Sequence, residues 1–144
     1  EWIIPVLAEY GVDRLSVHYE ACPYPRRTLK KIHDNGMKAG LAFNPGTPIP
    51  DLRFCLDYLS FIVLLTTEPE EWAGEYLPTV LDKMRENKPK YDGIEWVVDG
   101  GVGARNIHEI YTFGADTVVS GRAVFENNTI AKNLKEMKEK SIGR

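Results

Sequence analysis

The sequence lacks several features that would assign it to a common functional class. No apolar stretch approaches the ~20 residues that a transmembrane helix needs, so no membrane partner is expected. It has no long basic block and its formal net charge is −3, so no nucleic-acid partner is expected either. It has few cysteines: Cys22 and Cys55 fit no metal-binding spacing and are interpreted as the reduced thiols of a cytoplasmic protein.

The chain also has no linker, charge block or low-complexity tract that would divide its 144 residues. A single domain is therefore predicted, and 43% hydrophobic residues suffice for a core. The first residue is Glu1 rather than Met, and an apolar helical pattern begins at once without a capping residue. We therefore expect that the N-terminus has been cut off.

Apolar runs alternate with amphipathic segments along the whole chain. Strands are predicted at residues 14–20, 37–44, 61–67, 94–99 and 115–121. Helices are predicted at residues 1–13, 25–36, 51–59, 77–88, 104–114 and 129–140, with a short one at 122–125. Five strands that alternate with helices indicate βαβ units and a parallel sheet.

The position of the glycines distinguishes two architectures of this class. An open doubly wound sheet usually binds a nucleotide through a glycine-rich turn after its first strand, and no such turn follows residues 14–20. Here the glycines follow the last two strands, at 100–101 and at 121, which is the usual phosphate site of a (β/α)8 barrel. The barrel is therefore favoured.

Three segments resemble, in this order, the ribulose-phosphate 3-epimerase family: "LSVHYEA", "NGMKAGLAFNPGTPI" and "VVDGGVGARNIHEIYTFGADTVVSGRAVF". The resemblance implies an α/β (β/α)8 TIM barrel, of which residues 1–144 would be a single-domain C-terminal portion with strands four to eight. It also implies metal-dependent epimerisation at C3 of a ketose phosphate, D-ribulose 5-phosphate to D-xylulose 5-phosphate, in the pentose phosphate pathway. Without the first three strands, the fragment alone is expected to be inactive, and its exposed strand edge could make it a homo-oligomer.

The same resemblance assigns roles to individual residues. Asp99 would be the catalytic acid/base group and a ligand of a divalent metal ion (Zn, Fe, Mn or Co), while the other family ligands lie on strands that have no counterpart here. The backbone N–H groups of the two glycine turns would bind the phosphate of the sugar-phosphate substrate. These groups belong to Gly100, Gly101, Gly121 and Arg122.

His18 and Asn44 follow predicted strands and match family residues at the substrate site. Two other interpretations stay open: His18 as a hydrogen-bonded core histidine, and Asn44 as a structural turn residue. His33 and His108 lie on predicted helices among charged neighbours and are expected at the surface.

The chain departs from the family at two places. Arg122 stands where the family often has serine, and it suits a phosphate equally well. The sequence Glu70, Glu71, Trp72 and Ala73 replaces most of a glycine-rich loop that closes over the phosphate, and Leu65 replaces a methionine just before it. Because carboxylates near a phosphate are unfavourable, we expect this loop not to form the usual clamp.

Other functions remain compatible with the residues. The chain could act on another sugar phosphate such as allulose 6-phosphate, or be an aldolase or decarboxylase of the same superfamily, because fold alone does not fix chemistry. It could also be a non-catalytic phosphate-binding barrel. The family's strand-two and strand-three metal ligands, if encoded upstream, would favour the enzyme.

Overall fold

The computed structural model describes residues 1–69 and 74–142, and these form one parallel β-sheet with helices around it. The strands are β1 (Arg14–His18), β2 (Lys38–Phe43), β3 (Leu59–Leu65), β4 (Glu95–Asp99) and β5 (Thr117–Val119). Their order in the sheet is their order in the sequence, and every neighbouring pair is parallel. The predicted five-stranded parallel α/β sheet is confirmed.

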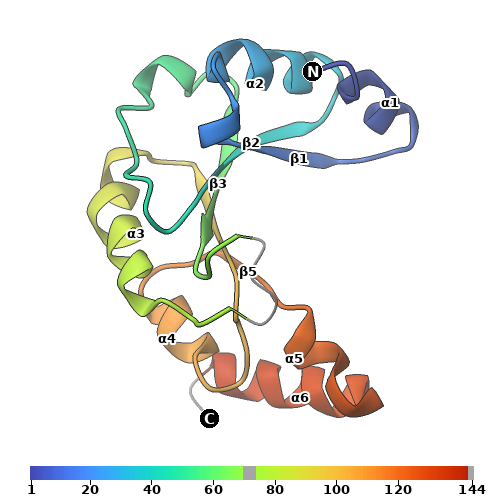
Figure 1. The fold of residues 1–144 in the computed structure, drawn as a ribbon, viewed down its shortest axis with the longest axis vertical. Helices are drawn as coiled ribbons and strands as arrows, with labels where there is room; N and C mark the ends of the chain where they lie inside the picture. Colours follow the sequence, from blue (N-terminus) through green and yellow to red (C-terminus); the bar gives the residue numbers. More distant parts are fainter. Residues whose placement is uncertain (70–73, 143–144) are drawn as a thin grey trace.

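The part of the chain that the structure describes has six helices, of which the first precedes β1. They are α1 (Ile4–Glu9), α2 (Pro25–Asp34), α3 (Leu81–Asn87), α4 (Ile107–Thr112), α5 (Arg122–Phe125) and α6 (Ile130–Ser141). Single 3-10 turns connect them: η1 (Tyr19–Ala21), η2 (Arg53–Cys55), η3 (Pro78–Val80), η4 (Lys88–Lys90) and η5 (Glu126–Asn128). In Figure 1 the strands form an arc, and most of the helices lie along its outer side.

The apolar residues form two clusters, one on each face of the sheet. The larger cluster lies between the sheet and the helices and includes fully buried Leu29 and Ile32 of α2. The smaller cluster lies on the concave face and consists of Ala42, Phe61, Val63 and Val97. Burial on both faces explains why β2 and β3 read as continuous apolar runs. Within the described residues, no helix combines the length and the apolarity that a membrane crossing requires.

One predicted helix is wrong. Residues 51–59 contain a single 3-10 turn, η2, in place of the expected helix. The Asp51 side chain accepts the backbone N–H of Arg53 at 3.0 Å and also binds its guanidinium, while the N–H of Leu52 donates to the hydroxyl of Tyr91 at 3.1 Å. These bonds satisfy the backbone without a helix. Four other helices are shorter than predicted, because α1 spans only Ile4–Glu9, α2 ends at Asp34, α3 begins at Leu81 and α4 begins at Ile107.

A polar network links the amino-terminal ends of the strands across the concave face. The Arg14 guanidinium lies 2.9 Å from the Glu95 carboxylate and 4.4 Å from the centre of the Phe61 ring. The other oxygen of Glu95 accepts the hydroxyl of Thr117 at 2.6 Å. Gly40 makes this arrangement possible, because a Cβ atom there would lie 2.4 Å from the Phe61 ring.

We expect Gly40→Ala to destabilise the fold by about 1–3 kcal/mol, the usual cost of overpacking, because the new methyl group displaces the Phe61 ring. Urea denaturation measures this change. Gly46→Ala is the matched control, since a Cβ atom at that position meets nothing within 4 Å. Phe61→Leu in the Gly40→Ala background should recover part of the loss. Equal stability of the two alanine variants would show that Phe61 does not need this space.

Candidate functional site

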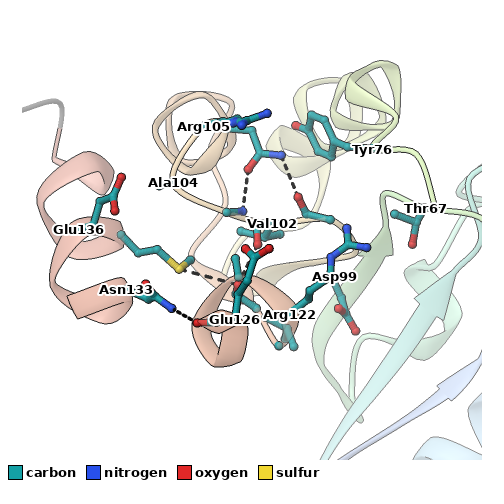
Figure 2. A pocket seen from close by; sticks show the side chains of 18 of the residues that line it. Thr67, Tyr76, Asp99, Val102, Ala104, Arg105, Arg122, Glu126, Asn133 and Glu136 are labelled. Carbon is teal, nitrogen blue, oxygen red and sulfur yellow. Dashed lines mark hydrogen bonds between the residues drawn. The ribbon is translucent and has the colours of Figure 1, made fainter. Parts of the chain in front are cut away.

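The carboxyl ends of the last three strands meet at one edge of the sheet. Asp99, the last residue of β4, is in register with Leu65 of β3 and with Val119 of β5. A pocket of about 910 Å³ opens beside this edge, between the segments that follow these strands and helices α5 and α6. Figure 2 shows Asp99, Arg122 and Glu126 among the side chains that line it.

Asp99 is the carboxylate at the end of a buried strand. Burial raises the pKa of this carboxyl group, and a hydrogen bond from the backbone N–H of Gly100 offsets only part of that effect. A raised carboxyl pKa brings the group closer to the pH at which it can both take up and release a proton. Asp99 therefore has the environment of an acid/base group.

The backbone after Asp99 is fixed by the end of β3. The N–H of Thr66 donates to the carbonyl of Asp99 at 2.8 Å, and the Thr66 hydroxyl donates to the carbonyl of Gly100 at 2.6 Å. Gly100 has a φ of +119°, and a Cβ atom there would lie 2.8 Å from the backbone nitrogen of Thr67. Only glycine fits this position, so it has a structural requirement besides any contact with a ligand.

The second glycine begins a loop that Asn106 holds in shape. The Asn106 amide accepts the N–H of Gly103 at 2.9 Å and donates to the carbonyl of Gly101 at 3.1 Å. Gly101 has a φ of +65° and lies against Tyr76, whose pKa burial raises to about 12. The sequence pattern contains Asn106, but its role emerges only from these contacts.

Gly121 and Arg122 form the opposite part of the pocket wall, where β5 passes into α5. Gly121 has a φ of −97°, and a Cβ atom there would meet nothing within 4 Å, so this position does not require glycine for its conformation. Arg122 is exposed and is the first residue of α5. Asp99, Gly101, Gly121 and Arg122 thus line one pocket. Gly100 is not among its lining residues, and its N–H donates to the Asp99 carboxyl group.

His18 and Asn44 are not part of this pocket wall. They lie at the carboxyl ends of β1 and β2, and Glu20 connects them. One Glu20 oxygen lies 3.4 Å from Nδ1 of His18, and the other accepts the backbone N–H of Asn44 at 2.8 Å. His33 and His108 are exposed, as predicted.

The two cysteines are free thiols, as predicted, with Cys22 half-buried and Cys55 buried. Burial raises the pKa of Cys55 to about 11. Cys55 is therefore protonated at neutral pH and is not a nucleophile.

Asp99 by itself does not fit a complete metal site. Residues 1–69 and 74–142 contain no group of three or more His, Cys, Asp or Glu side chains that could hold a metal ion. Asp99 thus offers a single carboxylate, whereas oxygen-preferring divalent ions take about six ligands. The expectations for Glu70, Glu71, Trp72 and Ala73 fall on residues outside the described ranges.

Residues 1–125 match the sequence pattern that describes the "Ribulose-phosphate 3 epimerase family". Ribulose-phosphate 3-epimerase of Escherichia coli K12 is 39% identical in an alignment of 140 positions, which covers 94% of this chain and 62% of that protein. The Bacillus subtilis enzyme of the same name is 34% identical in an alignment of 140 positions, which covers 94% of this chain and 64% of that protein. The chain thus spans less than two thirds of the length of these relatives.

Solved structures show the same fold at low sequence identity. The 3-hexulose-6-phosphate synthase from Salmonella typhimurium has a TM-score of 0.75 at 16% identity, covering 98% of this chain and 67% of that chain. The structure of KGPDC from Streptococcus mutans in complex with D-R5P has a TM-score of 0.76 at 18% identity, covering 98% and 66%. These proteins are TIM barrels, so the sheet described here has a TIM-barrel-like arrangement.

We expect Asp99→Asn to leave the fold intact and to raise its melting temperature slightly at pH 7. Burial disfavours the ionised carboxylate in the folded state, so the protonated form contributes stability that is lost as the pH rises through the raised pKa. The neutral amide avoids that loss, and its advantage should shrink as the pH falls toward 4.

Melting temperatures from pH 4 to 8 measure the effect. Asp92→Asn, at an exposed turn position, is the control and should show no such trend. A strong destabilisation by Asp99→Asn at pH 7 would show that the ionised carboxylate supports the fold.

Proposed function

We propose a function for this chain, which belongs to the ribulose-phosphate 3-epimerase family. It carries the strand-seven acid/base group and the phosphate site of an enzyme that inverts C3 of a ketose phosphate. The reaction proposed is that of D-ribulose 5-phosphate to D-xylulose 5-phosphate. The observation that supports it most is the carboxyl group of Asp99, half-buried and with a raised pKa, in the same pocket as Arg122.

In this proposal residues 1–144 correspond to strands four to eight of a (β/α)8 barrel. The sequential order of five parallel strands, with the helices on one side, supports it, because a barrel is built in this way. The relatives also contain residues that have no counterpart in this chain. Those residues would supply the other acid/base group and the further ligands of the divalent metal ion, to which Asp99 would contribute one oxygen.

The chemistry assigned to Asp99 is proton transfer. The hydrogen on C3 is acidic because the neighbouring carbonyl stabilises the resulting enediolate. The ionised carboxylate of Asp99 removes this proton from one face of the carbon, and an acid on the other face returns a proton, which inverts the centre. In the reverse reaction Asp99, now protonated, gives its proton back. Its raised pKa makes the ionised carboxylate a stronger base for the removal step.

The phosphate would bind at the wall formed by the two glycine turns. The backbone N–H groups proposed for this contact are those of Gly101, Gly121 and Arg122. The sequence-based expectation for Gly100 is dropped, because its N–H already donates to the Asp99 carboxyl group and Gly100 does not line the pocket. The exposed guanidinium of Arg122 can add two parallel hydrogen bonds to phosphate oxygens. That Asp99, Gly101, Gly121 and Arg122 line the same pocket supports this placement.

We expect Asp99→Asn to lower turnover of D-ribulose 5-phosphate at least ~100-fold, the low end of what a general acid/base contributes. The assay uses the full-length product of the gene that encodes this chain and follows D-xylulose 5-phosphate. The amide keeps the shape of the carboxylate but cannot accept the C3 proton, and it should also weaken binding of the metal ion. Near-normal turnover by a folded Asp99→Asn enzyme would exclude Asp99 as the acid/base group.

We expect Arg122→Ser to weaken binding of the sugar phosphate by about 1.5–3 kcal/mol, the value of a charge-assisted hydrogen bond. Titration calorimetry with the ketose phosphate measures it. Arg105→Ser is the matched control, because Arg105 lines the same pocket on the side of α4. Equal losses in both variants would point to general electrostatic attraction, and no loss in Arg122→Ser would move the phosphate elsewhere.

A further inference from the structure

We infer that Glu20 is a positioning residue at the carboxyl-terminal ends of β1 and β2. It fixes the turn at residues 44–47 and the imidazole of His18. Lys83 holds the same turn from its other side. The contacts of Glu20 and Lys83 with this turn, called the Glu20–Lys83 clamp below, are features of the structure. The effect of the clamp on catalysis rests on the proposed function.

The two carboxylate oxygens of Glu20 contact the turn and His18, respectively. One accepts the backbone N–H of Asn44 at 2.8 Å, and the other lies 3.4 Å from Nδ1 of His18. The side chain is 27% exposed. Partial burial alone would raise its pKa, but the hydrogen bonds from the Thr47 side chain and from the Asn44 N–H outweigh it, and the pKa lies below its ordinary value. Glu20 is therefore ionised at neutral pH.

Lys83 of α3 holds the turn through its carbonyl groups. Its Nζ donates to the carbonyl oxygens of Asn44 at 2.9 Å, Pro45 at 2.6 Å and Thr47 at 2.6 Å. An ammonium group has three hydrogens, so these bonds use all of them. Lys83 consequently has no donor left for a substrate phosphate, and its role at this mouth is to fix the backbone.

The two charges thus bind opposite sides of one turn. The Glu20 carboxylate accepts hydrogen bonds from N–H and hydroxyl groups, and the Lys83 ammonium group donates hydrogen bonds to carbonyl oxygens. Attraction to Glu20 also raises the pKa of Lys83, although burial lowers it more. Because each charge satisfies polar groups of the turn, the path of the backbone from Asn44 to Thr47 is held against both β1 and α3.

The clamp orients two side chains toward the edge that carries Asp99. Ala42 of β2 lies in the cluster on the concave face. Because side chains alternate between the two faces along a strand, Asn44, two residues later, lies on the same face. The Asn44 Oδ1 atom is buried, and residues 1–69 and 74–142 offer it no hydrogen-bond partner. Such an acceptor suits a hydroxyl of a bound sugar. His18 is in register with Ala42, and its Nδ1 lies 3.4 Å from the Glu20 carboxylate.

The experiment compares Glu20→Ala, Glu20→Gln and Glu86→Ala in the full-length gene product. Glu86 is exposed on α3, the helix of Lys83, and serves as the control. The first readout is amide hydrogen exchange at Asn44, which needs no activity. We expect exchange roughly tenfold faster in Glu20→Ala, because a bond to a charged acceptor is lost. Glu20→Gln keeps an acceptor oxygen and should exchange at close to the normal rate.

The second readout is steady-state kinetics with D-ribulose 5-phosphate. A misplaced Asn44 weakens binding in the ground state and the transition state alike, so KM should rise roughly tenfold with kcat little changed. Glu20→Gln should recover most of this loss, and Glu86→Ala should match the unaltered protein.

Each outcome decides one claim. Unchanged exchange at Asn44 in Glu20→Ala would overturn the clamp. Faster exchange with unchanged KM would overturn the positioning role and leave a structural one. If the unaltered protein itself shows no epimerase activity, the proposed function fails, whereas the exchange data still decide whether the clamp exists.

Discussion

The site depends on the close approach between the end of β3 and the backbone that follows β4. Gly100 passes Thr67 at a distance that leaves no room for a side chain, and Thr66 donates to the carbonyls on both sides of this point. This junction fixes the direction in which the chain leaves Asp99. Because the carboxyl group then lies beside packed backbone, it is partly removed from water and its pKa rises. One steric constraint thus sets both the position and the acidity of the group.

The two sides of the strand edge are built by different means. Beside β4 and β5 the loop from Gly101 to Asn106 is shaped mainly by neutral hydrogen bonds to the Asn106 side chain and by glycine conformations. Beside β1 and β2 the turn is held between two charged side chains, Glu20 and Lys83. The first side carries the exposed guanidinium of Arg122, which suits an anion. The second side has its charges already satisfied by the backbone, which suits recognition of uncharged hydroxyl groups.

The sequence predicts the strands well because burial on both faces leaves continuous apolar runs, as in β2 and β3. It also predicts Asp99 and the paired glycines, because these follow such a run directly. It does not predict the contacts of Lys83 or Asn106, since each depends on where a distant segment folds back. The wrong helix at residues 51–59 has the same origin: Tyr91, which accepts the N–H of Leu52, lies 39 positions away in the chain.

The central claim is that the chain contributes to the removal and return of a proton at C3. The most direct measurement is the conversion of D-ribulose 5-phosphate by the full-length gene product in deuterated water, with the product examined by NMR. The account predicts deuterium at C3 of the D-xylulose 5-phosphate formed, because the returned proton comes from a group that exchanges with solvent. Product that forms with its original hydrogen at C3 and no deuterium there would contradict the account.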